Sequence, residues 1–299
     1  MRNIIMMFAF LSSVLVMLGC SKTTESDVGS VTFRLTDAPL IANDVDGVWV
    51  KFKEIQINSN GWQSVKTFTD FTPGDVIEPA DNTNGIFNLI DLQNGNSALL
   101  AENELEPGHY SHIRIILDST YDHHLSFDTG TDESLDTTHS GPNGNFADGH
   151  IEIAGEFTIE AGITTILMLD FNANKSIVKS GSGYKLHPSI RLVTVDTTGS
   201  VTVPLTGFPA DARTVGYIYA EGTYSTSERT ADANGQYFTN AIAADEPDSG
   251  NLFFGYMPGG TYTVVVVTYN ADGTLTDYEK QATVTVTVGQ NTIAEAIAY

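Results

Sequence analysis

Apolar and polar positions alternate along most of the chain, and this two-residue period predicts β-strands. Val31, Phe33 and Leu35 are separated by polar residues, as expected for a strand with one buried face. The same pattern predicts further strands over residues 48–57, 110–117, 150–159, 163–171 and 184–195. Only residues 95–104 favour a short helix. The sequence therefore predicts an all-β chain.

Three segments predict more than strand formation. In 48–57 the apolar face shifts by one residue at Lys53 and Glu54, which indicates a β-bulge. The segment 163–171 contains few polar residues and predicts a strand buried on both faces. The valine run within 263–268 predicts a central strand, because an exposed strand of this composition would invite pairing with other chains.

The chain divides near residues 196–199 into two predicted domains. Beyond this boundary, turn signals at 258–260 and 270–273 separate short strands. Regular turns between short strands are typical of a β-sandwich. We therefore expect two consecutive β-sandwich domains, one over 29–196 and one over 197–299.

The N-terminal residues have the features of a secretory signal peptide. Arg2 is the only charge before an apolar run, which is shorter than the roughly 20 residues of a membrane-spanning helix. Gly19 and Cys20 follow, and they resemble the lipobox of bacterial lipoproteins. We expect a signal peptide over 1–19, a lipid on Cys20 and a polar tether over 20–28. An ordinary signal peptide with an incidental cysteine is the alternative.

Lipid attachment at Cys20 would determine the location of the protein. Ser21 follows the cysteine where an aspartate retention signal would stand, so we expect an anchor in the outer membrane of a two-membrane cell. Cys20 is the only cysteine, which excludes structural disulfides. Stability must therefore come from packed cores.

The charge balance excludes one class of partner. Aspartate and glutamate number 37 against 14 lysines and arginines, for a formal net charge of −23. Such a chain repels nucleic acid and anionic membrane surfaces. The favoured interpretation of the excess of acidic residues is a solvated acidic surface. The alternative interpretation is that the acidic residues attract divalent cations.

Segments at both ends of the first predicted domain show a family resemblance. Residues 29–39 (GSVTFRLTDAP), 169–178 (LDFNANKSIV) and 184–191 (YKLHPSIR) resemble a family of bacterial lipoprotein domains known as domain of unknown function 4382. The resemblance spans residues 29–195. It implies a lipoprotein of the cell envelope and carries no activity.

The second predicted domain resembles the carboxypeptidase-regulatory-like and starch-binding-like sandwiches. Residues 230–238 (TADANGQYF) and 257–264 (MPGGTYTV) show this resemblance. It implies a transthyretin-like β-sandwich that serves as a spacer or as a carbohydrate-binding module.

Histidines and carboxylates gather in and around the acidic segment 128–148. The candidate metal ligands are His123, His124, His139, His150, Asp128 and Asp132. On one loop such side chains could hold calcium or a transition metal. A solvated loop is the favoured alternative, because no calcium-loop spacing is met and adjacent His123 and His124 would point to opposite faces of a strand. The length of the segment still marks it as a functional insertion.

Asp37 follows the first predicted strand and precedes Pro39. An aspartate at such a turn accepts hydrogen bonds from backbone N–H groups, and the proline fixes φ. Structural capping is the favoured interpretation of Asp37, and contact with a ligand is the alternative.

Exposed aromatic side chains are the feature that carbohydrate binding needs, because sugar rings stack their C–H faces on them. Trp62 lies at a predicted hairpin tip and is the leading candidate. Further candidates are Tyr217, Tyr219, Tyr224 and Tyr256. The alternate spacing of Tyr217 and Tyr219 favours one packed face of a strand instead.

Catalysis has little support in the sequence. Two Ser-x-x-Lys matches, at 176–179 and 182–185, lie in a glycine-containing hairpin and lack the partner motifs of a Ser-Lys nucleophile. Metalloprotease, phosphate-loop, dinucleotide-binding and Gly-x-Ser-x-Gly motifs are absent from the sequence. We predict a non-catalytic binding module for carbohydrate or another extracellular ligand, without a cofactor unless calcium is bound. A structural or interaction module is the alternative, and a metal-dependent enzyme is a distant third.

Overall fold

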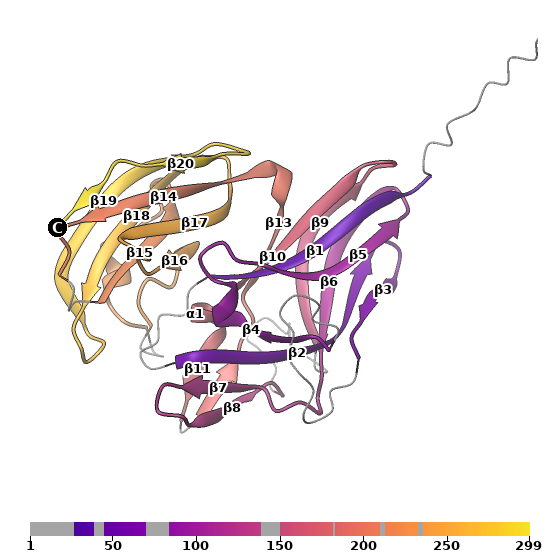
Figure 1. The fold of residues 1–299 in the computed structure, drawn as a ribbon, viewed down its shortest axis with the longest axis horizontal. Coiled ribbons are helices and arrows are strands. Elements are labelled where there is room, and N and C mark those ends of the chain that lie inside the picture. The colour runs from indigo at the N-terminus through magenta and orange to yellow at the C-terminus, as the bar shows by residue number, and fades with distance from the viewer. Residues whose placement is uncertain are drawn as a thin grey trace, which may run out of the picture.

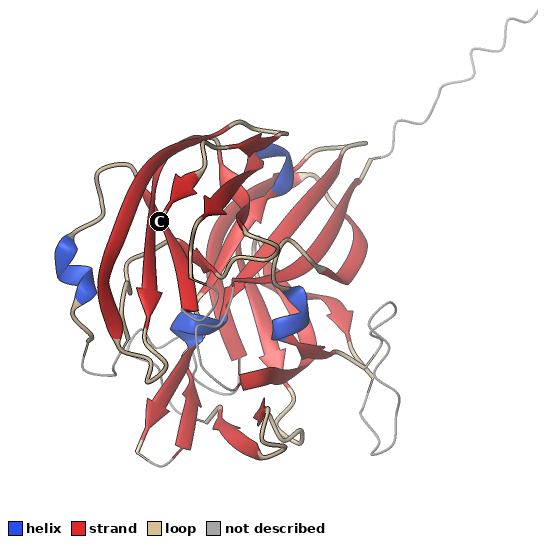
Figure 2. Cartoon of the chain, turned by 60° about the vertical axis from the view of Figure 1, so that its left-hand side comes forward, coloured by secondary structure: helices blue, strands red, loops and turns tan. Residues whose placement is uncertain are grey.

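The computed structural model describes residues 27–38, 45–69, 84–138, 150–181, 183–209, 213–232 and 236–299. The described residues form two β-sandwiches that follow each other along the chain (Figure 1). Strands make up almost all the regular structure, and the helices are short turns of three or four residues in the connections (Figure 2). Within the described residues, no helix has the length and apolar composition to cross a membrane. The predicted all-β fold of sandwiches is confirmed.

The first sandwich packs a small sheet against a large one. In the described part of the chain, the small sheet contains β13 (Ile190–Thr194), β10 (Thr164–Asn172), β1 (Gly29–Ala38) and β5 (Ala98–Leu105), in that order. The large sheet contains β2 (Val45–Asn58), β3 (Trp62–Thr67), β4 (Ile86–Asn88), β6 (Gly108–Leu117), β7 (His124–Phe127), β8 (Asp132–Asp136), β9 (His150–Ile159), β11 (Ile177–Ser180) and β12 (Gly183–Leu186). Single-turn helices η1 (Leu89–Leu92) and α1 (Ala173–Ser176) connect strands. Apolar residues of both sheets share one core.

The long strand β2 organises the large sheet. Its first half pairs with β7 and its second half with β6, while β4 and β3 follow one another along its other edge. The register with β6 shifts between Phe52 and Glu54, so Lys53 is the bulged residue. The bulge predicted at this position is confirmed.

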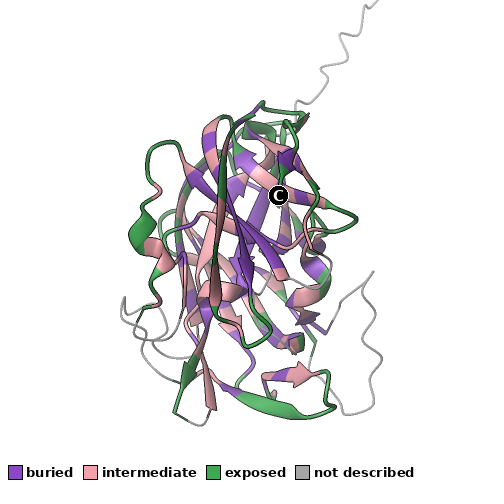
Figure 3. Cartoon of the chain, turned by 90° about the vertical axis from the view of Figure 1, so that its left-hand side faces the viewer, coloured by how far each residue is buried: buried purple, intermediate pink, exposed green. Residues whose placement is uncertain are grey.

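The second sandwich also consists of two sheets. One contains β17 (Asn251–Pro258), β14 (Thr198–Thr206), β20 (Asn291–Ile293) and β21 (Ile297–Ala298), and the other β16 (Ala243–Asp245), β15 (Arg213–Ala220), β18 (Gly260–Tyr269) and β19 (Leu275–Val286). The single-turn helices are η3 (Val195–Thr197), before β14, and η4 (Thr226–Arg229). Strand β18 lies between β15 and β19, and its consecutive valines 264–267 are buried, so both faces of the strand are covered. Buried residues lie along the strands of the sandwiches (Figure 3). The predicted central strand is confirmed.

Two strand predictions need correction. Residues 98–105 form strand β5, so the predicted helix over 95–104 is wrong. Ala101 pairs with Phe33 and Leu99 with Arg34, which leaves Leu100 as a bulge and buries it beside Ala101. The bulge interrupts the two-residue alternation of apolar and polar residues. Two adjacent apolar residues, Leu100 and Ala101, are then buried together, and adjacent apolar residues are also typical of an amphipathic helix.

The second correction concerns the ends of the first sandwich. The strand predicted over 184–195 is broken into β12 and β13, which belong to different sheets. The strand predicted over 163–171 is buried on both faces only from Leu167 to Phe171, whereas Ile166 is 37% exposed.

Candidate functional site

The two sandwiches meet where the segment before β5 contacts β17. Gly95 has φ +82°, a left-handed conformation that favours glycine, and a Cβ atom there would lie 2.6 Å from Cε1 of Phe253. Because Gly95 has no side chain, the Phe253 ring packs directly against the first sandwich. The Tyr256 hydroxyl donates a hydrogen bond of 3.4 Å to the Gly95 carbonyl oxygen. These contacts hold β17 against the first sandwich.

A second set of contacts joins the sandwiches around α1 and β13. The side-chain amide of Gln236 donates to the carbonyl oxygens of Asn174 and Ile177, at 3.0 and 3.3 Å. The Arg191 guanidinium contacts Met257 Sδ at 3.7 Å. With two places of contact, the space between the sandwiches has a defined shape.

A groove of about 500 Å³ opens beside the contact between Gly95 and Phe253. Gly95 of the first sandwich contributes to its lining, and so does the connection, through Val195 and Asp196. The rest of the lining comes from the second sandwich: Thr198, Gly199, Ser200, Phe253, Gly255, Tyr256, Gly289, Gln290 and Asn291. Ligand sites in proteins have volumes of roughly 300–1,000 Å³ and occur preferentially at domain interfaces. The groove is therefore the candidate functional site.

Aromatic and hydrogen-bonding side chains share the lining of this groove. Phe253 and Tyr256 are half-buried, so part of each ring remains accessible. Asp196 and Gln290 are exposed and supply a carboxylate and an amide. The groove thus offers ring faces next to donors and acceptors.

Asn291 adds an oriented amide to the groove. Its Oδ1 accepts hydrogen bonds from the Ser200 and Thr202 hydroxyls, at 3.0 and 3.2 Å. These two bonds fix the side chain and leave the amide nitrogen as its remaining hydrogen-bonding group. Asn291 therefore presents a pre-organised donor.

The backbone next to the groove is strained. Tyr256 has φ +51° and Asn94, beside Gly95, has φ +57°. A positive φ is a genuine outlier for a bulky residue such as tyrosine. Strain of this kind persists where surrounding structure imposes it and clusters at binding sites, which supports the groove as a site.

Asp37, for which the sequence left capping and ligand contact open, lies at the end of β1 beside a smaller cavity. Its buried carboxylate accepts hydrogen bonds from the Ala173 N–H at 2.9 Å and from the Gln93 side chain at 3.3 Å. These bonds tie β1 to α1 and to the residues after η1. With Asp170, Asp37 also lines a cavity of about 30 Å³ between the sandwiches, large enough for a water molecule.

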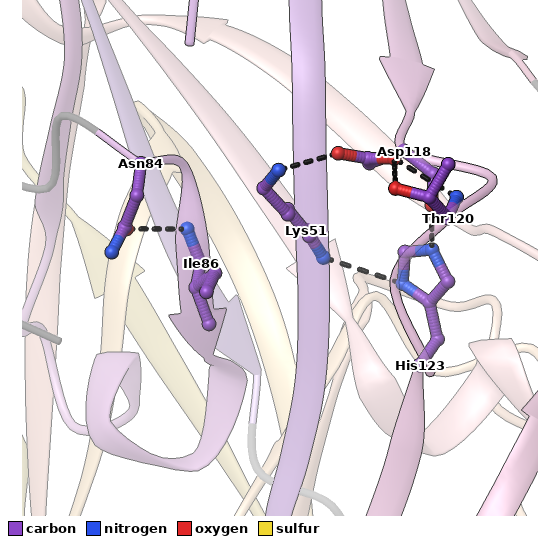
Figure 4. A network of polar contacts seen from close by, with 6 residues as sticks. All are labelled: Lys51, Asn84, Ile86, Asp118, Thr120 and His123. Carbon is purple, nitrogen blue, oxygen red and sulfur yellow. Dashed lines mark hydrogen bonds and ion pairs between the residues drawn. The ribbon is translucent and has the colours of Figure 1, made fainter. Parts of the chain in front are cut away.

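His123 lies in a buried polar network (Figure 4). The network is located where the pairing partner of β2 changes from β7 to β6. The Lys51 backbone N–H donates to His123 Nδ1 at 3.3 Å, so Nε2 carries the proton and donates to the Asp118 carbonyl oxygen at 3.0 Å. Burial lowers the pKa of His123, which keeps the ring neutral. Both ring nitrogens are therefore engaged within the protein.

A buried ion pair completes this network. The Lys51 ammonium binds the Asp118 carboxylate, whose other oxygen accepts from the Thr120 N–H and hydroxyl at 2.9 and 2.7 Å. Burial raises the pKa of Asp118, but the bonds from Lys51 and Thr120 outweigh it and lower the pKa to about 2. The pair fixes the turn at which β6 leaves β2.

The other described candidates for metal binding lie apart from His123. The His124 ring stacks on Trp49, with 6.2 Å between ring centroids. Asp128 and Asp132 are exposed near the turn between β7 and β8, and His150 begins β9. Among the residues that the structure describes, no three histidine, cysteine, aspartate or glutamate side chains form a group that could hold a metal ion.

Two predicted site residues lie outside the described residues. These are Cys20, the expected lipid attachment site, and His139, together with the rest of 139–149. The described part of the acidic segment borders a second pocket of about 410 Å³ between β8 and β12, whose lining includes Tyr121, Asp122 and Tyr184. This pocket is the alternative location for a ligand.

Trp62 begins β3, and its ring is partly covered. The Arg114 guanidinium lies over it, with 3.8 Å between the guanidinium carbon and the ring centroid. Arg114 also binds the Glu152 carboxylate at 3.2 Å. A sugar would have to displace this cation–π contact to reach the covered face of the ring.

The tyrosine candidates have different surroundings. Tyr217 and Tyr219 are fully buried, as their spacing predicted, and Tyr217 stacks on Phe238 with 4.2 Å between centroids. The Tyr224 hydroxyl donates to Glu279 at 2.7 Å. Of the four predicted tyrosines, Tyr256 is the one that lines the groove.

The fold and the groove define an all-β protein of two sandwiches with a candidate ligand site between them. The family model described as "Domain of unknown function (DUF4382)" matches residues 28–188, and the chain belongs to this family. No curated protein matches the chain.

Several solved structures resemble the chain weakly. The TIE protein of Bacillus anthracis is 12% identical with a TM-score of 0.20, over 91% of this chain and 34% of that one, so the chain spans about a third of its length. The minor pilin GBS52 of Streptococcus agalactiae is 12% identical with a TM-score of 0.22, over 89% and 94% of the two chains. The major pilin subunit BcpA of Bacillus cereus is 9% identical with a TM-score of 0.20, over 91% and 70%. At these TM-scores the similarities carry no inference about function.

Proposed function

We propose that this chain is a non-catalytic, lipid-anchored protein of the cell envelope that binds an extracellular carbohydrate in the groove between its sandwiches. The observation that carries the proposal is the lining of the groove, where the accessible rings of Phe253 and Tyr256 lie beside the Asn291 amide. A sugar ring needs this combination, because its C–H face packs on an aromatic ring while its hydroxyls exchange hydrogen bonds with polar groups.

The charge of the groove supports a neutral sugar. Asp196 is the charged residue of its described lining, and a carboxylate accepts hydrogen bonds from sugar hydroxyls but repels anionic ligands. Four glycines, at 95, 199, 255 and 289, keep the lining close to the backbone and give a ligand access to backbone groups.

The anchor is the second part of the proposal. Cys20 after an apolar N-terminal run would carry the lipid, and residues 20–28 would connect it to β1. The outer membrane is the proposed location. The alternative function is a spacer or a docking module for other envelope proteins, which needs no ligand in the groove.

A glycan array probed with the full-length chain tests the binding function. Wild type should bind a set of neutral glycans, and Tyr256→Ala should lose at least tenfold in affinity for them, or about 1.4 kcal/mol. Trp62→Ala serves as the matched aromatic control, because Trp62 does not line the groove, and it should retain binding. Binding to no glycan would favour the spacer function, and loss with Trp62→Ala alone would move the site to β3.

Fractionation of cells tests the anchor separately. The wild-type chain should be found with the outer membrane, and its N-terminal peptide should carry fatty acyl groups by mass spectrometry. Cys20→Ser should shift the protein to the aqueous fraction. An unmodified wild-type protein in that fraction would contradict lipid anchoring and leave carbohydrate binding to be judged by the array.

A further inference from the structure

Asp245, the last residue of β16, is a buried acid behind the wall of the groove. Its side chain is only 1% exposed, and its Oδ2 accepts a hydrogen bond of 2.6 Å from the backbone N–H of Phe253. Its Oδ1 is buried and has no hydrogen-bond partner in the described part of the chain. One oxygen thus holds the strand that carries Phe253, and the other lacks the partner that a buried carboxylate needs.

The groups around Asp245 do not neutralise a negative charge. Glu246 and Asp248 follow it in sequence, and the Arg213 guanidinium on β15 is bound to Glu246 at 2.9 Å. From the first sandwich, Asp37 and Asp170 line the small cavity that Ala243 and Ala244 of β16 also line. Burial, followed by the charges of Glu246 and Asp248, raises the pKa of Asp245 to about 7, although the backbone N–H groups of Phe253 and Glu246 lower it.

We propose that Asp245 positions the groove wall through Phe253 and that its proton occupancy sets the affinity of the groove for its ligand. The proposal rests on the proposed carbohydrate site and adds a pH dependence to it. With the proton bound, Asp245 is neutral, so it stays buried and its Oδ2 still accepts from the Phe253 N–H.

Loss of the proton changes the balance. A buried carboxylate with an unpartnered oxygen is costly, so the ionised form favours arrangements in which Oδ1 reaches water. Any such arrangement weakens the bond to Phe253 and displaces a ring that lines the groove and packs on Gly95. The groove is therefore intact below neutral pH and loosened above it.

Nuclear magnetic resonance of the full-length chain tests the coupling without a ligand. The ¹³C signal of the Asp245 carboxyl group and the amide signal of Phe253 should titrate with one shared midpoint near neutral pH. In Asp245→Asn the Phe253 amide should not titrate. Asp248→Asn, which removes an exposed carboxyl three residues away, should keep the Phe253 titration. A Phe253 amide in wild type that ignores the Asp245 titration would overturn the proposal.

Affinity measurements test the consequence for binding, with maltoheptaose, cellohexaose and chitohexaose as neutral probes. Wild type should bind its best probe about tenfold more weakly at about pH 8.5 than at about pH 5.5, the factor given by one unit of pKa difference between bound and free protein. Asp245→Asn should show equal affinity at both pH values. Equal affinity in wild type would overturn the proposal. If no probe binds, carbohydrate binding and its pH dependence fail together, while the Phe253 titration still decides whether Asp245 positions this wall.

Discussion

The Phe253 ring of the second sandwich packs against the backbone of Gly95 in the first, so closely that a Cβ atom at Gly95 would lie 2.6 Å from the ring. This contact brings together residues separated by about half of the chain. Both residues line the groove, and Tyr256, which has a strained positive φ, donates a hydrogen bond to the Gly95 carbonyl oxygen. Whatever the groove binds, its shape depends on this contact.

Gly95→Ala should damage the groove without unfolding either sandwich. The new Cβ would force the Phe253 ring away, and the left-handed φ adds about 1 kcal/mol of strain. Gly130→Ala is the matched control, because Gly130 has φ +75° and an open space around it. We expect Gly95→Ala to lose more stability in urea than Gly130→Ala, because only the first variant adds a clash with Phe253 to the backbone strain. Only Gly95→Ala should lose glycan affinity. Equal glycan affinity in the two variants would show that binding does not depend on the contact between Gly95 and Phe253.

The Lys51–Asp118 pair should be a strong determinant of stability. Asp118→Asn keeps the side-chain shape but leaves the Lys51 ammonium buried without its counter-ion, a change that typically costs about 3–5 kcal/mol. Glu152→Gln removes the partner of Arg114 in a more exposed ion pair and should cost less than about 1 kcal/mol. Urea denaturation measures both, and similar losses would show that the buried pair has no special role.

The stability of the fold should fall as the pH rises from about 4 to about 7. Asp245 has a folded-state pKa of about 7 against 3.8 as its ordinary value, so in this interval the folded chain holds a proton that the unfolded chain has lost. The shift corresponds to about 4 kcal/mol. Asp245→Asn should flatten this part of the profile measured by thermal unfolding. An unchanged slope in the variant would assign the pH dependence to other groups.

A second carboxyl should act in the opposite direction in acid. The pKa of Asp118 is lowered to about 2, so its contribution is present above about pH 4 and disappears as the pH falls through 2. We expect the unfolding free energy of wild type to drop by about 2 kcal/mol over this interval. In Asp118→Asn this drop should be missing, which unfolding at a series of acid pH values would show.

The contact between Trp62 and Arg114 should be visible in fluorescence. In a Trp49→Phe background Trp62 is the single remaining tryptophan, so its emission reports on the covered ring. Arg114→Ala should expose the ring, shift its emission to longer wavelength and cost about 0.5–1 kcal/mol. An unshifted spectrum would mean that the guanidinium does not cover the ring in solution.

Much of the fold follows from side-chain alternation along the sequence. Strand β9 has the predicted bounds, 150–159, because one face is buried and the two-residue period is unbroken. The bulge at Lys53 is visible because it shifts that period by one residue. The bulge at Leu100 misleads for the same reason, because an interrupted period within a short strand is indistinguishable from a helical turn.

The candidate site could be predicted only in part. Tyr256 is a candidate in the sequence, but strict alternation with buried Leu252 and Phe254 would bury it. The register of β17 with β14 shifts between Phe254 and Met257, and this irregularity leaves Tyr256 in the lining of the groove. The groove joins Gly95, Asp196 and Asn291, three positions that the chain brings together only when the sandwiches pack. The sequence also does not predict that Arg114 covers the Trp62 ring. Arg114 lies on β6, which is separated from β3 by β2.

The central claim is that the groove between the sandwiches is the ligand site, and chemical-shift mapping with a glycan selected on the array tests it most directly. Amide signals of residues 195–200, 253–256 and 289–291, with Gly95, should move together on titration. Shifts confined to β3 around Trp62, or to the pocket around Tyr184, would contradict the claim.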